Sequence, residues 1–204
     1  MTDESDARNG DLLAVLNTEY FVLQGASGAS ISEASSRASL YLLTLSSSLV
    51  SLGFVLGLSA DVFGPFAAAA LSTVFLLGCF TVVRLTETSI ENLRALRGMA
   101  RIRAYYADLS PLARPYFVSA GSVAADAQAM LGRRSNRWWW VGTMATMIGA
   151  VNAVVGGSGI ALLTTAAGAS LSLSVATGLG AAVVLVTLAV QFQRRRFATE
   201  FAGS

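Results

Sequence analysis

Four apolar stretches, each of roughly 20 residues and without a charged side chain, constrain the fold of this chain more than any other feature. They cover residues 38–58, 62–83, 138–155 and 171–192. Because an α-helix rises about 1.5 Å per residue, a stretch of this length crosses a hydrocarbon core of about 30 Å. The chain as a whole is 54% hydrophobic and only 13% charged, unlike a soluble domain. We therefore predict an all-α polytopic membrane protein with four transmembrane helices arranged in two hairpins.

The arginines predict the orientation in the membrane. All 14 basic residues are arginine, and each lies before the first stretch, between the second and third, or after the fourth. Since positively charged connections stay in the cytoplasm, both termini are expected on the cytoplasmic side. Residues 1–9 are polar and acidic and lack the basic start of a cleavable signal peptide, which agrees with this orientation. The exclusive use of arginine is typical of a GC-rich bacterial genome, so we expect a bacterial inner membrane.

This orientation divides the chain into five segments that alternate between water and lipid. In chain order they are a cytoplasmic amphipathic helix (1–37), a first transmembrane hairpin (38–83), a cytoplasmic helical region with a proline-containing turn (84–137), a second transmembrane hairpin (138–192) and a basic cytoplasmic tail (193–204). The two larger cytoplasmic segments have opposite net charge: residues 1–39 carry 2 arginines and 6 acids, whereas residues 84–137 carry 9 arginines and 4 acids. We therefore expect them to pair as a cytoplasmic layer.

The two paired segments each present an apolar face at helical spacing. Residues 24–30 are mostly small, which leaves a loop as an alternative, but we favour one continuous helix into the first span. The second span is expected to continue as a helix to Asp108. Lying side by side and antiparallel, the two helices would place Glu19 near Arg101 and Arg103. The apolar faces consist of Leu13, Leu16, Tyr20 and Leu23 on the first helix and Ile90, Leu93, Leu96 and Ala100 on the second.

The third and fourth spans carry small residues at four-residue intervals. Lipid offers no hydrophobic drive for helix association, and small residues let backbones approach closely, so we predict that these edges face each other. Asn152 is expected to hydrogen-bond across that contact. Residues 156–170 are uncharged and rich in glycine, alanine and threonine, and we interpret them as a connection able to re-enter the interface. The edges are formed by Ala145, Gly149, Ala153 and Gly157 on the third span and by Ser174, Gly178 and Ala182 on the fourth.

Two groups of residues are candidates for contacts outside the helix bundle. Members of the first are candidate contacts for an anionic lipid or ligand, because guanidinium groups pair with phosphate and carboxylate. Alternatively, these arginines form a solvated helix face and pair with nearby acids. Nucleic acid is disfavoured as their ligand because no aromatic residues alternate with them. Members of the second group mark the membrane interface, with cations in the headgroups and indoles at the boundary. The first group is Arg94, Arg97, Arg101, Arg194, Arg195 and Arg196; the second is Arg37, Arg137, Trp138, Trp139 and Trp140.

Residue types that carry catalysis and metal binding are scarce. The chain has no histidine, and Cys79 is its only cysteine, so neither a thiol pair nor a histidine-based metal site can form. The acids are scattered along predicted helix surfaces, without an HExxH, P-loop or dinucleotide-binding motif. We therefore expect no enzymatic activity, no cofactor and no metal.

These features favour a non-enzymatic membrane interaction, scaffold or effector protein. The alternative is a small channel or transporter. No Asp, Glu or Arg lies at mid-depth in the four spans, and because such groups commonly mark ion or proton pathways, transport is disfavoured. The expected partners are the lipid bilayer and an unidentified protein, with homo-oligomerisation as one option and no role for nucleic acid.

One local pattern carries a resemblance to known proteins. The run Ile31-Ser32-Glu33-Ala34-Ser35-Ser36-Arg37-Ala38, with Tyr20 to Gln24 upstream, resembles a group of small, functionally uncharacterised four-span integral membrane proteins of GC-rich bacteria. More loosely, a cytoplasmic helix that enters a transmembrane hairpin through one basic residue is similar to the membrane effectors of bacterial antiphage signalling systems. The resemblance covers residues 1–60 and implies topology and an effector role, but no catalytic or ligand residue. This chain departs from those effectors because no nucleotide-binding motif accompanies its spans.

Overall fold

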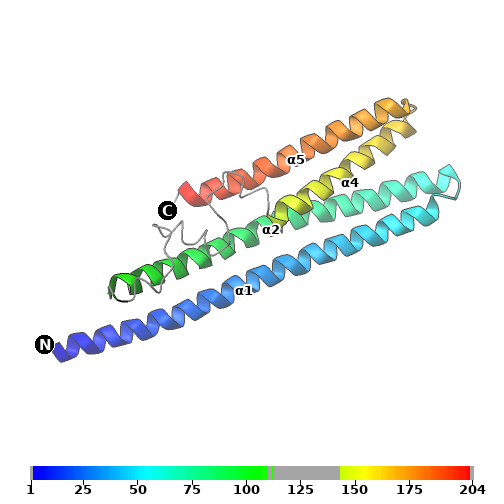
Figure 1. Cartoon of the computed structure of the whole chain (residues 1–204). Helices are drawn as coiled ribbons and strands as arrows, with labels where there is room; N and C mark the ends of the chain where they lie inside the picture. Colours follow the sequence, from blue (N-terminus) through cyan, green and yellow to red (C-terminus); the bar gives the residue numbers. More distant parts are fainter. Residues whose placement is uncertain (1, 110–111, 113–142, 203–204) are drawn as a thin grey trace. The chain divides into compact units, whose positions relative to one another are not determined.

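The computed structural model describes residues 2–109, 112 and 143–202, and the elements in these ranges are helices (Figure 1). They are α1 (Thr2–Val55), α2 (Ala60–Leu109), α4 (Met144–Ala166) and α5 (Leu171–Ala202). Each of the four contains a stretch long and apolar enough to cross a membrane. The all-helical fold class and the four candidate spans are therefore confirmed. The predicted interface residues Arg137, Trp138, Trp139 and Trp140, and most of the proline-containing turn, lie outside the described residues.

Helices α1 and α2 each continue well beyond their apolar stretch. The small residues at 24–30 do not interrupt α1, so the prediction of one continuous helix into the first span is confirmed. Helix α2 continues past Val83 to Leu109, as the apolar periodicity predicted. A tight turn at residues 56–59 joins them, in which the Leu58 N–H donates to the Val55 carbonyl at 3.0 Å.

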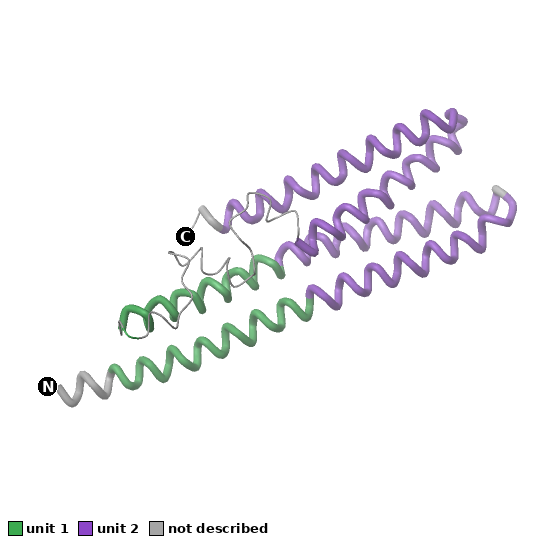
Figure 2. Tube along the Cα trace, in the orientation of Figure 1, with its two compact units in different colours: residues 1–33, 88–139 green, residues 34–87, 140–204 purple. Residues whose placement is uncertain are grey.

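The chain forms two compact units, coloured separately in Figure 2. Unit 1 contains residues 1–33 and 88–139, and unit 2 contains residues 34–87 and 140–204. Helix α1 therefore has its first part in unit 1 and its second part in unit 2, whereas α2 has its first part in unit 2 and its second part in unit 1.

In unit 1, the halves of α1 and α2 pair side by side and antiparallel. The Ser27 hydroxyl donates to Asn92 Oδ1 at 2.6 Å, and the Tyr106 hydroxyl donates to the Leu13 carbonyl at 3.1 Å. Early residues of α1 therefore lie opposite late residues of α2, which confirms the predicted antiparallel pairing. The specific approach of Glu19 to the arginines of α2 stays a prediction.

The apolar faces of unit 1 lie where their spacing predicts. On α2 the four face residues are all buried, and on α1 the four are half-buried. Gly98 has a close-packing role here, because a Cβ at this position would lie 2.7 Å from a Leu23 methyl group. The buried hydrophobic residues of α2 in this unit are Ile90, Leu93, Ala95, Leu96, Met99, Ala100 and Ile102.

In unit 2, α4 and α5 pack along their small-residue edges. A Cβ at Gly157 would lie 2.5 Å from the Gly178 carbonyl oxygen and 2.9 Å from Ala182 Cβ. The predicted contact between these edges is therefore confirmed. The prediction of a re-entrant connection over 156–170 is wrong in its first part, because α4 continues to Ala166 and the turn occupies only residues 167–170. Gly168 provides that turn with a positive φ of 87°, which L side chains rarely adopt.

The apolar core of unit 2 joins α1, α2 and α4. Its largest fully buried side chains include Tyr41 of α1, Leu85 of α2 and Ile148 of α4. The buried members of this core are Ala38, Tyr41, Leu71, Val74, Val82, Leu85, Ala145, Ile148 and Val155. Many large apolar side chains of unit 2 point outward instead, for example Phe80 (75% exposed), which suits a surface covered by lipid.

Candidate functional site

The candidate arginines are divided between the two units. Arg94 and Arg101 are exposed on α2 and Arg97 is half-buried there, all in unit 1. Residues 194–196 are exposed near the end of α5, and Arg37 is exposed on α1, all in unit 2. Three of the six candidates for anionic contacts therefore belong to each unit, and their ligand stays a prediction.

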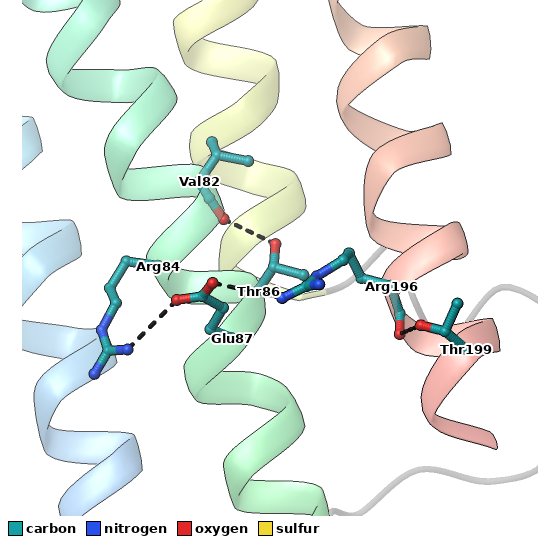
Figure 3. A network of polar contacts seen from close by, with 6 residues as sticks. All are labelled: Val82, Arg84, Thr86, Glu87, Arg196 and Thr199. Carbon is teal, nitrogen blue, oxygen red and sulfur yellow. Dashed lines mark hydrogen bonds and ion pairs between the residues drawn. The ribbon is translucent and has the colours of Figure 1, made fainter. Parts of the chain in front are cut away.

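One of these arginines, Arg196, takes part in an ion-pair network centred on Glu87 (Figure 3). The Glu87 carboxylate lies 3.4 Å from Arg84 Nη1 on the same helix and 3.5 Å from Arg196 Nη2 on α5. The three side chains are between 36% and 50% exposed, so solvent screens the network and its contribution to stability is small. Its effect is to link the ends of the apolar stretches of α2 and α5, and to hold one predicted lipid-contact residue near an acid.

A buried amide, Asn152, lies where α4 crosses α1 and α2 inside unit 2. The Tyr41 hydroxyl donates to Asn152 Oδ1 at 3.2 Å, and Asn152 Nδ2 donates to the Phe75 carbonyl at 3.2 Å. The same nitrogen lies 3.5 Å from Cys79 Sγ. The amide fits only because Gly78 has no side chain, since a Cβ there would overlap the amide group.

The prediction that Asn152 bonds across the α4–α5 contact is therefore wrong. Gly149 and Gly157 face α5, because a Cβ added at them would lie near Ala189 and Ala182 respectively. Position 152 is rotated by about 100° from position 153, which shares their four-residue spacing. Its side chain consequently points to α1 and α2. There it satisfies the Tyr41 hydroxyl, which would otherwise be a buried polar group in an apolar core.

A second buried amide, Gln193 of α5, accepts hydrogen bonds from two hydroxyls at the beginning of α4. Its Oε1 accepts from the Thr146 hydroxyl at 2.9 Å and from the Thr143 hydroxyl at 3.4 Å. Thr143 is also the N-cap of α4, because its hydroxyl accepts from the Thr146 N–H at 3.2 Å. Gln193 Nε2 is buried and has no hydrogen-bond partner among the described residues. The cluster fixes the register of the two helices near one end of unit 2.

An apolar groove lies at the opposite end of unit 2, near the α1–α2 and α4–α5 turns. It has a volume of about 840 Å³ and runs between the first half of α2 and the second half of α4. Its wall is apolar except for the hydroxyls of Ser72 and Thr165, and the Thr165 hydroxyl donates to the Ala161 carbonyl of its own helix at 2.9 Å. Leu185 of α5 contributes to the inner end.

Sequence reasoning missed three of these features, although each has a local signal. Glu87 follows Arg84 by three residues, which is the spacing of a helical ion pair. Gln193 is an amide at the end of an apolar span, as conspicuous as Asn152. The groove is lined on α2 by a run of small residues beginning at Gly64 and Pro65, where a neighbouring helix leaves space unfilled.

Comparisons with known proteins add no functional assignment. No family model, no curated protein and no solved structure matches this chain.

Proposed function

We propose that the protein is a non-enzymatic interaction scaffold of the bacterial inner membrane, with both termini in the cytoplasm. Unit 2 anchors it through four transmembrane helices in two hairpins. Unit 1 lies in the cytoplasm and binds a helix of a partner protein. The alternating distribution of arginine supports this orientation, because every arginine falls on one predicted side.

A second apolar stripe on α1, beside the one that packs on α2, carries this proposal. Leu12, Val15 and Val22 are 43%, 65% and 58% exposed, although this part of the chain is expected to lie in water. Val15, Val22 and Ala29 follow one another at intervals of seven residues, which is the repeat of a helix-to-helix seam. Exposed apolar side chains that recur along one face of a water-facing helix are typical of a protein interaction site.

The interior of unit 2 favours an anchor over a channel. Two of its buried polar side chains bond to side chains of other helices, as Tyr41 does with Asn152 and Gln193 with Thr146. These groups fill the contacts between helices and do not face a polar cavity. The groove described above is apolar and offers an ion no compensation for its lost hydration.

Placing two charges on the exposed stripe is expected to abolish the complex. In the variant Val15→Arg/Val22→Arg, partner binding would bury two guanidinium groups without a counter-charge, so the complex should dissociate. The measurement is the apparent size and composition of the protein extracted from native membranes in mild detergent. The wild type should run as a discrete complex, and the variant as a single chain.

Asn17→Arg provides the matched control, because Asn17 is exposed on another side of the same helix. This variant should retain the complex. Wild-type protein that runs as a single chain, or a double-arginine variant that keeps the complex, would refute the proposed interaction role.

A further inference from the structure

The apolar groove of unit 2 has the length of one membrane leaflet. From Phe63 to Phe75 it extends about 18 Å along α2, and from Val155 to Ala166 about 16 Å along α4, at 1.5 Å per residue. One leaflet contributes half of the hydrocarbon core, or about 15 Å. Both walls belong to helices that carry candidate membrane spans, so the groove opens within the apolar part of the bilayer.

The groove is closed at the depth where a leaflet ends. Gly156 lets two large side chains approach the α4 backbone, since a Cβ there would lie 2.7 Å from both the Phe75 ring and a Leu185 methyl group. Just beyond them, Asn152 fills the crossing of the helices against Gly78. The space is therefore a blind groove that begins near the two turns and stops near mid-membrane.

The groove has a volume of about 840 Å³, which suits acyl chains. A hydrocarbon chain is only about 4 Å across, as judged from the contact distance between carbon atoms, so one or two chains fit side by side. Water is excluded as the occupant because the wall offers it almost no polar partners.

Charge near the mouth further specifies the lipid. Asp61, next to the α1–α2 turn, is the only charged residue in the sequence from 38 to 83, and residues 138–193 contain none. An anionic headgroup would therefore meet an acid and no arginine at this end of the unit. A zwitterionic headgroup meets no such repulsion.

We propose that this groove is a binding site for the acyl chains of a zwitterionic phospholipid, in the leaflet next to the α1–α2 and α4–α5 turns. Binding depends on the apolar wall and on the absence of side chains at Gly64 and Gly159, which both line the groove and have no atom within 4 Å of an added Cβ. Lipid fills a space that would otherwise be a void between the two helices.

The test is photolabelling of the full-length protein in liposomes that contain phosphatidylethanolamine with a diazirine in one acyl chain. We expect the label to concentrate on groove residues of α2 and α4. Gly159→Phe places a ring in the groove and should reduce labelling there to the level of residues that face bulk lipid. Gly64→Phe is a second variant on the opposite wall with the same expected loss, which guards against a folding defect in one of them.

Gly180→Phe is the matched control, because Gly180 of α5 is equally open but does not line the groove. It should leave the labelling pattern unchanged. Competition with unlabelled phosphatidylethanolamine should displace the label more effectively than phosphatidylglycerol does. Labelling spread evenly over the outward-facing residues and unaffected by both groove variants would overturn the proposal, and so would disulfide crosslinking of two copies through Ser72→Cys.

Discussion

Gly178→Ala should destabilise the protein, whereas Gly180→Ala two positions along the same helix should not. A Cβ at Gly178 would lie 2.8 Å from both the Gly157 carbonyl oxygen and Ala161 Cβ. Neither atom can rotate away, because one is backbone and the other is attached directly to it. Inserting a methyl group therefore forces α4 and α5 apart, and overpacking of this kind costs about 1–3 kcal/mol.

The control substitution, Gly180→Ala, is expected to stabilise the protein. Gly180 has no atom within 4 Å of an added Cβ, so Gly180→Ala only gains helix propensity, which stabilises by up to about 1 kcal/mol. The measurement is the thermal unfolding midpoint of the purified protein in one detergent. Gly178→Leu should lower the midpoint further than Gly178→Ala does. Equal midpoints for Gly178→Ala and Gly180→Ala would show that the two helices are not in close contact at this position.

Gly78→Ala is the second substitution with a large expected effect, and its cost should depend on Asn152. The added methyl group overlaps the Asn152 amide, which is itself held by Tyr41 and the Phe75 carbonyl. Displacing the amide breaks both hydrogen bonds and leaves buried polar atoms without partners, a loss of about 1–3 kcal/mol.

A double-mutant cycle isolates this contact. Asn152→Ala alone should destabilise, because it removes the acceptor of the Tyr41 hydroxyl. Combined with Gly78→Ala it should cost clearly less than the two single changes added together, since no amide remains to clash. Gly64→Ala on the same helix is the control and should be close to neutral, because no atom lies within 4 Å of its added Cβ. Additive effects in the cycle would contradict the packing of Gly78 against Asn152.

The parts of the fold that follow from helical periodicity were predictable from the sequence. The seven-residue spacings from Leu13 to Tyr20 and from Leu93 to Ala100 place these side chains on one face of each helix, and packing of that face against the facing helix follows directly. The small-residue edges of α4 and α5 were predictable for the same reason, as Gly157 and Gly178 could serve only a close approach.

The crossing of α4 with α1 and α2 was not predictable in this way. A single amide such as Asn152 has several candidate neighbours, and only the rotation of α4 decides between them. The groove also escaped prediction, because it is a space between Pro65 and Ile160 on helices that are far apart in the sequence. The local sequence of either wall reads as an ordinary apolar span.

Topology mapping with single cysteines tests the four-span arrangement most directly. In a Cys79→Ser background, a membrane-impermeant thiol reagent is applied to intact bacterial cells carrying one cysteine at Asn17, Ser59, Ser170 or Thr199, all of them exposed positions. With both termini in the cytoplasm, the reagent should label Ser59→Cys and Ser170→Cys, which lie in the two turns. It should label Asn17→Cys and Thr199→Cys only after the membrane is permeabilised. Labelling of Asn17→Cys or Thr199→Cys in intact cells would contradict this arrangement.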